Sequence, residues 1–196
     1  MDLELLTPQK VGEATELVKR VFGKTLLSQK FRKPTTGEIY EYAMHDYKSG
    51  KVPSLVFPLN VKHEVVALRQ FRHAANHWLW EFPGGNQVTD ELPEEVAKRE
   101  LLEETGYAPT QLILLTPKPI WCEPADYVNP FYAFLATDCN LTSKPLLDPT
   151  EYLEVKTFPL SQWLAMIWDG KIRDSKTIAI TMLALPHLNT EVRNYK

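Results

Sequence analysis

The sequence predicts an α/β protein of the α+β kind, in which helices cover the faces of a mixed β-sheet. Two observations lead to this fold class. Short segments typical of strands surround a few helical segments, and the two kinds do not alternate strictly along the chain. The chain has 196 residues, of which 44% are hydrophobic and 24% charged, which is enough to bury the core of one sizeable domain.

The N-terminal segment is predicted to form a helix that leads into the main domain. Thr7 and Pro8 precede the run QKVGEATELVKRVF, which has a capping residue and a proline in its first turn. We therefore divide the chain into residues 1–35, a helix and lead-in segment, and residues 36–196, the main domain.

The main domain is predicted to contain several strands and three helices. The strands are alternating or continuously apolar runs bounded by turn residues. They cover residues 37–46, 53–60, 64–70, 77–82, 111–116, 130–137 and 152–158. One helix is acidic and lies near the middle of the chain. A second starts at Ser161 and ends near Gly170, and a third is capped by Asp174 and ends before Pro186.

Charge and composition exclude several classes of partner. A net charge of −3 and a pI near 6.0 give no general attraction to nucleic acid or to an anionic membrane. The N-terminus lacks the apolar segment of a signal peptide, and no run is long enough to cross a membrane. The spacing of Cys122 and Cys139 fits neither a zinc site nor a dithiol pair. We expect a cytoplasmic protein without nucleic-acid or membrane partners.

The sequence GGNQVTDELPEEVAKRELLEETGY, residues 84–107, concentrates negative charge. It holds seven acidic and two basic residues, a net charge of −5 against −3 for the whole chain. Pro93 suits a first helical turn, and Gly106 suits a C-terminal cap, so we predict a helix over residues 93–105. The apolar face of this helix would pack on a sheet.

Three carboxylates of this helix, those of Glu100, Glu103 and Glu104, share one face because they lie three or four residues apart. Such neighbours repel by roughly 0.2–0.5 kcal/mol per pair on an exposed helix. A hard divalent cation such as Mg²⁺ reverses the sign, because it prefers oxygen ligands. The protein itself would then leave this negative charge unbalanced, and bound cations together with a phosphate substrate would complete the site. The alternative is a solvated surface helix.

The stretch matches, position by position, the signature G-x5-E-x7-R-E-U-x-E-E-x-G-U, in which U is a bulky aliphatic residue, and therefore resembles the Nudix hydrolases. Only Tyr107, at the final aliphatic position, departs from it. The residues in register are Gly85, Glu91, Arg99, Glu100, Leu101, Glu103, Glu104 and Gly106.

This resemblance implies an α/β/α sandwich with a mixed sheet and the hydrolysis of a nucleoside diphosphate linked to another moiety. Glu100 and Glu104 would be the main ligands of Mg²⁺ or Mn²⁺, and the carbonyl group of Gly84 a further one. Glu103 would be another ligand or a catalytic base. Gly85 and Gly106 would be structural residues of the signature, and Glu91 with Arg99 would form a structural pair that orients the loop.

The flanks of the signature are similar to the ADP-ribose and nucleotide-sugar pyrophosphatase branch of the family, over about residues 36–185. The segment 65–87 has the Gln-x-Arg and Glu-x-Pro-Gly-Gly steps of that branch, and Arg72 is a candidate clamp for a substrate phosphate. Pro124 matches a substrate-loop proline, although Glu123 and Ala125 replace the usual serine and glycine. Glu151 is the candidate general base, with Glu154 as the second choice.

The branch generally forms homodimers in which N-terminal strands help to build the base pocket of the partner. Phe31, Tyr40 or Tyr42 would then stack on a base, unless they belong to the core. Trp78 and Trp80 lie on one face of their strand, where Trp80 would line the substrate pocket or both would pack at the dimer interface.

Two other functions stay open. The same fold could hydrolyse nucleoside triphosphates, dinucleoside polyphosphates or NADH, although the NADH branch usually carries a zinc ribbon that two cysteines cannot build. A catalytically silent Nudix-fold binding module would be expected to lose carboxylates of the signature. This chain keeps Glu100, Glu103 and Glu104, which favours an enzyme.

Overall fold

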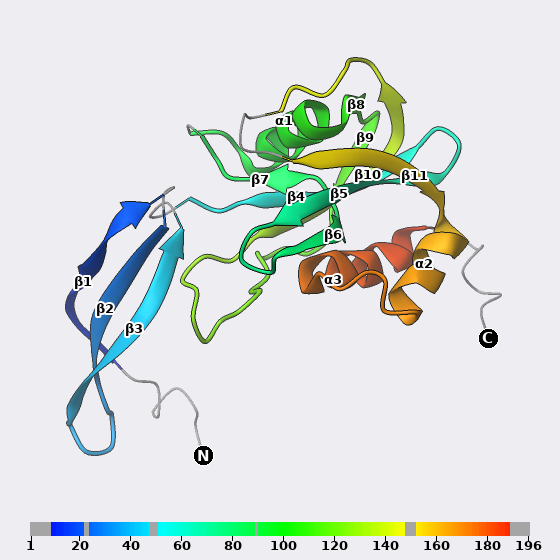
Figure 1. The fold of residues 1–196 in the computed structure, drawn as a ribbon. Coiled ribbons are helices and arrows are strands. Elements are labelled where there is room, and N and C mark those ends of the chain that lie inside the picture. Colours follow the sequence, from blue (N-terminus) through cyan, green and yellow to red (C-terminus); the bar gives the residue numbers. More distant parts are fainter. Residues whose placement is uncertain (1–8, 22–23, 48–50, 89, 148–151, 189–196) are drawn as a thin grey trace. The chain divides into compact units, whose positions relative to one another are not determined.

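The computed structural model describes residues 9–21, 24–47, 51–88, 90–147 and 152–188 (Figure 1). Contacts divide the chain into two compact units. The first combines residues 1–51 with Trp121–Pro130, and the second combines Val52–Ile120 with the chain from Phe131 onward. Each unit is described by itself.

The first unit contains a three-stranded antiparallel sheet of β1 (Gln9–Val21), β2 (Lys24–Arg32) and β3 (Ile39–Tyr47). The prediction of an N-terminal helix is wrong, because these residues form β1. Strand β1 pairs with β2 along its length, and Gly12 has a φ of 68°, outside the right-handed helical region. Pairing with β2, which the sequence did not predict, outweighs the local helical pattern. The predicted strand over residues 37–46 is confirmed as β3.

The second unit is built on a mixed sheet in the order β11-β5-β4-β10-β8. Strands β4 and β10 are parallel, and the other pairs are antiparallel. The predicted strands and the mixed sheet are confirmed, and the two shortest strands were not predicted. The strands are β4 (Ser54–Asn60), β5 (Glu64–Arg72), β6 (His77–Glu81), β7 (Gly84–Gly85), β8 (Tyr107–Ala108), β9 (Gln111–Leu114), β10 (Tyr132–Leu141) and β11 (Leu153–Pro159).

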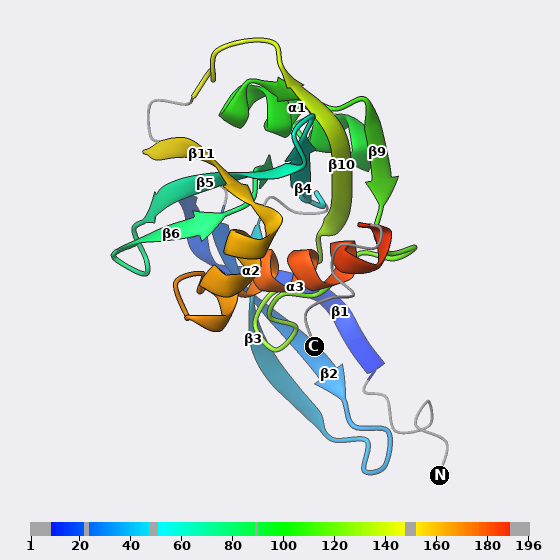
Figure 2. The same ribbon diagram turned by 90° about the vertical axis from the view of Figure 1, so that its right-hand side faces the viewer.

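Helices cover both faces of this sheet (Figures 1 and 2). Helix α1 (Pro93–Thr105) lies on one face, and α2 (Leu160–Trp168) and α3 (Ser175–Ala184) lie on the other, followed by a short 3-10 helix, Leu185–His187. The predicted cap of the last helix is confirmed, because the Asp174 carboxylate accepts a hydrogen bond of 2.8 Å from the amide of Thr177. In the described part of the chain, no helix is long and apolar enough to cross a membrane.

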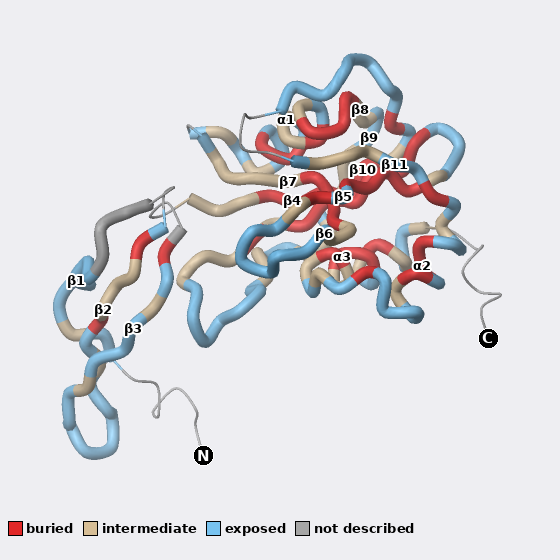
Figure 3. Tube along the Cα trace, viewed as in Figure 1, coloured by how far each residue is buried: buried red, intermediate tan, exposed pale blue. Residues whose placement is uncertain are grey.

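Alternation along the central strands divides the core into two layers. Leu55 and Phe57 of β4 belong to the layer under α2 and α3, whereas Val56 belongs to the layer under α1. Both layers are buried in the second unit (Figure 3). Trp163 is fully buried in the larger layer, and its Nε1 donates to Thr181 Oγ1 at 3.0 Å, which joins α2 to α3.

Leu101→Ala should lower the free energy of unfolding by about 2–5 kcal/mol, because the side chain is 0% exposed in the smaller core layer. Leu102→Ala is the matched control on the same helix, where the side chain is 39% exposed, and should change stability far less. Urea unfolding followed by circular dichroism measures both. Equal losses for the two variants would contradict the assignment of the buried helix face.

Candidate active site

Helix α1 is held at both ends, which fixes the direction of its side chains. At its start, the Glu95 carboxylate accepts a hydrogen bond of 2.8 Å from the amide of Leu92, just before Pro93. At its end, Gly106 has a φ of 77° and donates to the Leu102 carbonyl at 2.8 Å. A left-handed cap of this kind suits glycine, so the helix stops where the sequence predicts.

Arg99 connects the acidic residues of α1 to the loop before the helix. Its Nε donates to Glu91 at 2.8 Å, and its Nη1 donates to Glu100 at 2.8 Å and to Glu103 at 3.0 Å. Its Nη2 reaches both Glu91, at 3.2 Å, and the carbonyl group of Asn86, at 3.0 Å. The hydrogen bond to Glu91 contributes most to raising the pKa of Arg99, against an opposing effect of burial.

This network corrects one expectation. The pair of Glu91 and Arg99 is present, but the protein does not leave the negative charge of the helix unbalanced. Arg99 also neutralises part of the charge on Glu100 and Glu103. A guanidinium can do so because it carries several donors in one plane and can serve several carboxylates at once. Sequence spacing placed Arg99 next to the acids but gave no measure of how many it would contact.

The third carboxylate, that of Glu104, is buried and holds the backbone of the preceding loop. Its Oε2 accepts a hydrogen bond of 2.8 Å from the amide of Gly84, and the residue is 5% exposed. On its other side Gly84 packs against β4 so closely that a Cβ atom would overlap the carbonyl oxygen of Ser54 and the Cα of Leu55. Gly84 therefore lies in a fixed place between α1 and β4.

Gly85 has a different neighbour. A Cβ atom at this position would overlap the carboxylate of Glu100, whose side chain is only 13% exposed. The Gly84–Gly85 backbone thus lies against two of the carboxylates that the sequence singles out, Glu100 and Glu104. Absence of a side chain at both positions is what permits this approach.

The donor set of this region suits a hard divalent cation. It combines carboxylate oxygens of Glu100, Glu103 and Glu104 with the peptide backbone of Gly84 beside them, and Mg²⁺ and Mn²⁺ prefer oxygen ligands. Within the described ranges, no three His, Cys, Asp or Glu side chains converge as a preformed metal cluster, and Arg99 Nη1 contacts both Glu100 and Glu103. The residue types fit the ion, and metal ligation stays a prediction.

Arg72, the predicted phosphate clamp, forms a bidentate pair with a residue that the sequence analysis did not single out. Its Nε and Nη2 donate to the two oxygens of Glu81 at 2.8 and 2.6 Å. Burial lowers the pKa of Arg72, but the hydrogen bonds to Glu81 and the charges of Glu104 and Asp174 raise it overall. The only sequence signal for Glu81 was its place in the Glu-x-Pro-Gly-Gly step.

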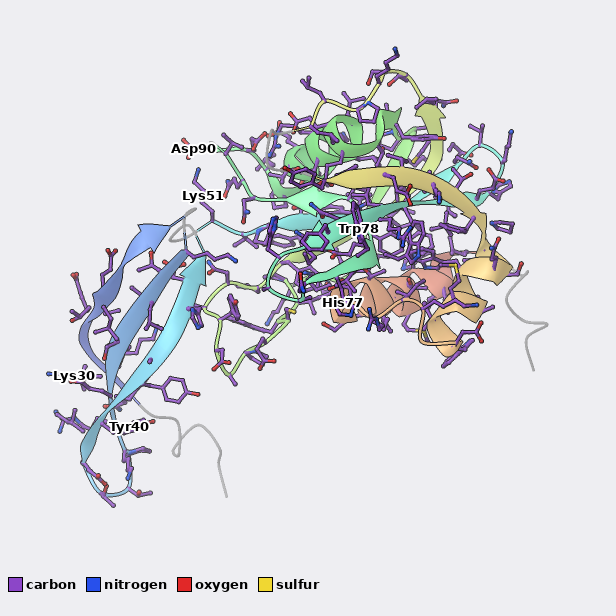
Figure 4. The ribbon with its side chains drawn as sticks, in the orientation of Figure 1. Lys30, Tyr40, Lys51, His77, Trp78 and Asp90 are labelled. Atoms are coloured by element: carbon purple, nitrogen blue, oxygen red, sulfur yellow. The ribbon has the colours of Figure 1, made fainter. Side chains whose placement is uncertain are left out.

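Trp80 does not join these residues. Adjacent residues of a strand point to opposite faces, so Trp80 and Glu81 lie on different faces of β6. The Trp80 ring packs edge-on against Phe158 with 4.9 Å between ring centroids, and the cations of Arg69 and Lys156 lie within 5.9 Å of its centroid. Trp78 is on the same strand (Figure 4) and is 47% exposed.

Of the two candidate general bases, the structure describes only Glu154. Glu151 lies outside the described residues. Glu154 is in β11, where hydrogen bonds from Lys156 and then Arg69 lower its pKa, and its carboxylate lies 3.2 Å from Lys156 Nζ and 3.4 Å from Arg69 Nη1. Glu154 lies within a strand, as the sequence predicts for residues 152–158, and its carboxylate is engaged by two cations.

Pro124 belongs to the first unit, in a loop that is attached to β3. The backbone amide of His45 donates to the Asp126 carbonyl at 2.6 Å, and that of Val128 donates to the His45 carbonyl at 2.9 Å. The hydroxyl group of Tyr42 donates to the Ala125 carbonyl at 3.0 Å. The loop therefore continues the sheet beyond β3 and holds Pro124 next to it.

A cavity of about 470 Å³ lies between this loop and the sheet of the first unit. Its lining is rich in aromatic rings, two of which, Phe31 and Tyr40, stack with 5.9 Å between their centroids. Tyr40 stands on β3 (Figure 4). The cavity is lined by Lys10, Phe31, Tyr40, Tyr42, Met44, Trp121, Pro124, Ala125, Asp126, Tyr127 and Val128.

Comparison with known proteins relates this geometry to a family. A family model of the NUDIX domain matches residues 49–179. An ADP-ribose pyrophosphatase of Bacillus subtilis is 33% identical over 136 residues, which cover 65% of this chain and 69% of the relative. A GDP-mannose pyrophosphatase of Klebsiella pneumoniae is 30% identical over 152 residues, which cover 74% of this chain and 75% of the relative.

A solved structure described as an ADP compounds hydrolase has the same fold. It superimposes with a TM-score of 0.77 at 20% identity, over 92% of this chain and 94% of that one. At this identity the likeness bears on the fold alone. It confirms the α/β/α arrangement with a mixed sheet that the sequence predicts.

The two neighbouring glycines should differ in their tolerance of a methyl group. Gly84→Ala should lower the free energy of unfolding by roughly 1–3 kcal/mol, because its Cβ would overlap backbone atoms of β4. Gly85→Ala should lower it less, because the three atoms nearest to its Cβ all belong to the Glu100 carboxylate, at the end of a rotatable side chain. Thermal and urea unfolding measure both variants, and the reverse order would contradict the packing described here.

Proposed function

The chain belongs to the Nudix family, and we propose that its reaction is the hydrolysis of the pyrophosphate bond of ADP-ribose or a related nucleoside diphosphate sugar. The products would be a nucleoside monophosphate and a sugar phosphate. Family membership and the pyrophosphatase relatives make the chain a Nudix pyrophosphohydrolase. The names of the relatives, one for ADP-ribose and one for GDP-mannose, support the nucleotide-sugar class without choosing the base or the sugar.

One observation carries the proposal. Two carboxylates of α1 lie against the backbone of a glycine pair, where Glu104 accepts from the Gly84 amide at 2.8 Å and Glu100 fills the space beside Gly85. This arrangement gathers oxygen donors at one end of the helix, where Arg99 holds Glu100 and the Gly84 amide holds Glu104. It suits the binding of a divalent cation together with a pyrophosphate.

In the proposed mechanism, Glu100, Glu104 and the carbonyl group of Gly84 would hold Mg²⁺ or Mn²⁺, and Glu103 would be a further ligand or would accept a proton. A bound ion would neutralise the pyrophosphate and lower the pKa of a water molecule. Arg72 binds a substrate phosphate through its guanidinium group. Glu151 remains our candidate for the base that takes the proton from the attacking water.

The aromatic cavity of the first unit is a candidate for base recognition. Its rings offer flat apolar surfaces, and Lys10 and Asp126 in its lining offer a donor and an acceptor for polar base edges. We assign Tyr42 and Pro124 to this contact, because the Tyr42 hydroxyl holds the loop that carries Pro124. Trp80 remains a proposed substrate contact on the strength of the sequence resemblance alone.

Several features of the whole enzyme stay proposals. We propose a homodimer in the cytoplasm, as the resemblance to the branch implies, acting on a small nucleotide substrate and not on nucleic acid or a membrane. We also propose that residues 36–196 form the Nudix hydrolase domain and residues 1–35 precede it. The family match over residues 49–179 lies within that domain.

A substrate panel tests the proposed function most widely. ADP-ribose, GDP-mannose, other nucleotide sugars, NADH, dinucleoside polyphosphates and nucleoside triphosphates are incubated with the enzyme and Mg²⁺, and phosphate is measured after treatment of the products with a phosphatase. We expect the highest kcat/KM with ADP-ribose or another nucleotide sugar. Preference for a triphosphate or NADH would contradict the nucleotide-sugar assignment and indicate another branch of the family. No turnover on any substrate would favour a non-catalytic binding module.

Glu104→Gln should lower kcat by roughly a hundredfold or more while the protein remains folded. The substitution keeps the shape of the side chain but removes the charge, and metal-assisted stabilisation of a transition state is worth several kcal/mol. Glu94→Gln is the control, because Glu94 is exposed at the start of the same helix. Wild-type turnover in Glu104→Gln would contradict the metal assignment.

A further inference from the structure

Glu81 is a buried carboxylate that the proposed mechanism does not use. It is the last residue of β6, opposite Leu68 of β5, and its side chain is only 4% exposed. A carboxylate in such a place is strongly disfavoured unless a cation and hydrogen bonds compensate it. The compensation comes from Arg72, whose side chain is 44% exposed, so the pair joins an interior acid to a surface cation.

The geometry of the pair restricts how the arginine can move. Two parallel hydrogen bonds, of 2.8 Å from Nε and 2.6 Å from Nη2, fix both the position and the plane of the guanidinium. On the β5–β6 ladder, Arg72 is opposite His77 and Glu81 is opposite Leu68. The Arg72 side chain must therefore run back along the strands to reach Glu81. Without the pair, nothing in this contact would hold the side chain in that direction.

The pair also leaves part of the guanidinium available. Glu81 uses Nε and one hydrogen of Nη2, which leaves the second hydrogen of Nη2 and both hydrogens of Nη1, and these point toward the terminal edge and the other side of the group. The pair lies close to the acidic helix, because Glu81 is followed closely in the chain by Gly84, whose amide donates to Glu104 of that helix at 2.8 Å. The charge of Glu104 also helps to raise the pKa of Arg72. A donor edge in that position suits an anionic diphosphate.

We propose that Glu81 is a positioning residue, which holds Arg72 in a fixed orientation so that the free edge of its guanidinium binds the diphosphate of the substrate. This inference rests on the proposed function for the identity of the substrate. Its physical advantage is preorganisation: a long, flexible side chain that is already ordered loses less conformational entropy when the ligand binds. Glu81 contributes through Arg72 and does not touch the substrate itself.

A double-mutant cycle on ADP binding tests the proposal. ADP carries the diphosphate, so isothermal titration calorimetry on the wild-type, Glu81→Gln, Arg72→Lys and the double variant requires no turnover. We expect each single substitution to weaken ADP binding by about tenfold, as for the loss of one charge-assisted contact. The double variant should bind no more weakly than Arg72→Lys alone, because Glu81 acts only through Arg72.

Two results would overturn the proposal. One is wild-type ADP affinity in Glu81→Gln, and the other is full additivity of the two substitutions. Asp169→Asn is the control, because it removes a salt bridge of 2.9 Å to Lys171 that is exposed and far along the chain from the pair. It should leave ADP binding unchanged, which separates loss of an ion pair in general from loss of this one.

Two further measurements distinguish a failure to fold, and a failure of the proposed function, from a failure of the role proposed for Glu81. If Glu81→Gln does not fold, Glu81→Asp replaces it, because the shorter acid keeps the charge but draws the guanidinium of Arg72 away from its wild-type position. Wild-type ADP affinity in that variant also overturns the proposal. If the wild-type enzyme hydrolyses no nucleotide sugar, the proposed function fails while the binding cycle still decides the role of Glu81. In an active enzyme, the same cycle on kcat/KM for ADP-ribose should show the same non-additivity.

Discussion

The pairing of Arg99 with its acidic neighbours is the interaction on which the proposed site depends. Four carboxylates in close sequence would repel one another, and the guanidinium contacts three of them, those of Glu91, Glu100 and Glu103. By binding Glu91 it also ties the loop before α1 to the helix. The loop backbone can therefore lie beside Glu100 and Glu104, which is the arrangement that brings oxygen donors together.

The structure balances negative charge in two different ways. Around Arg99, one cation serves several acids that belong to the same helix and loop. At Arg72, one cation serves a single buried acid, Glu81, through a two-point contact. In our proposal, the first arrangement keeps a cluster of carboxylates together for a metal ion, and the second holds an arginine in place for the diphosphate. The proposed pyrophosphate substrate would use both, because its negative charge would be met by cations on more than one side.

The sequence predicted most of the second unit, because its signals are local. Pro93 and Gly106 mark the ends of α1, a continuous apolar run marks β4, and alternation marks β11. The N-terminal helix was predicted wrongly, since only long-range pairing with β2 makes residues 9–21 a strand. Within the site, spacing identified the acids of α1 but not the contacts of Arg99 or the partner of Arg72, because these depend on how loop, strands and helix meet in space.

The central claim is that the carboxylate face of α1 binds a divalent cation. Binding of Mn²⁺ to the free enzyme tests it directly, by electron paramagnetic resonance of the unbound ion during a titration. The wild-type protein should take up Mn²⁺, and Glu100→Gln should weaken that uptake by at least about tenfold. Uptake that is unchanged in Glu100→Gln, or absent from the wild-type protein, would contradict the account.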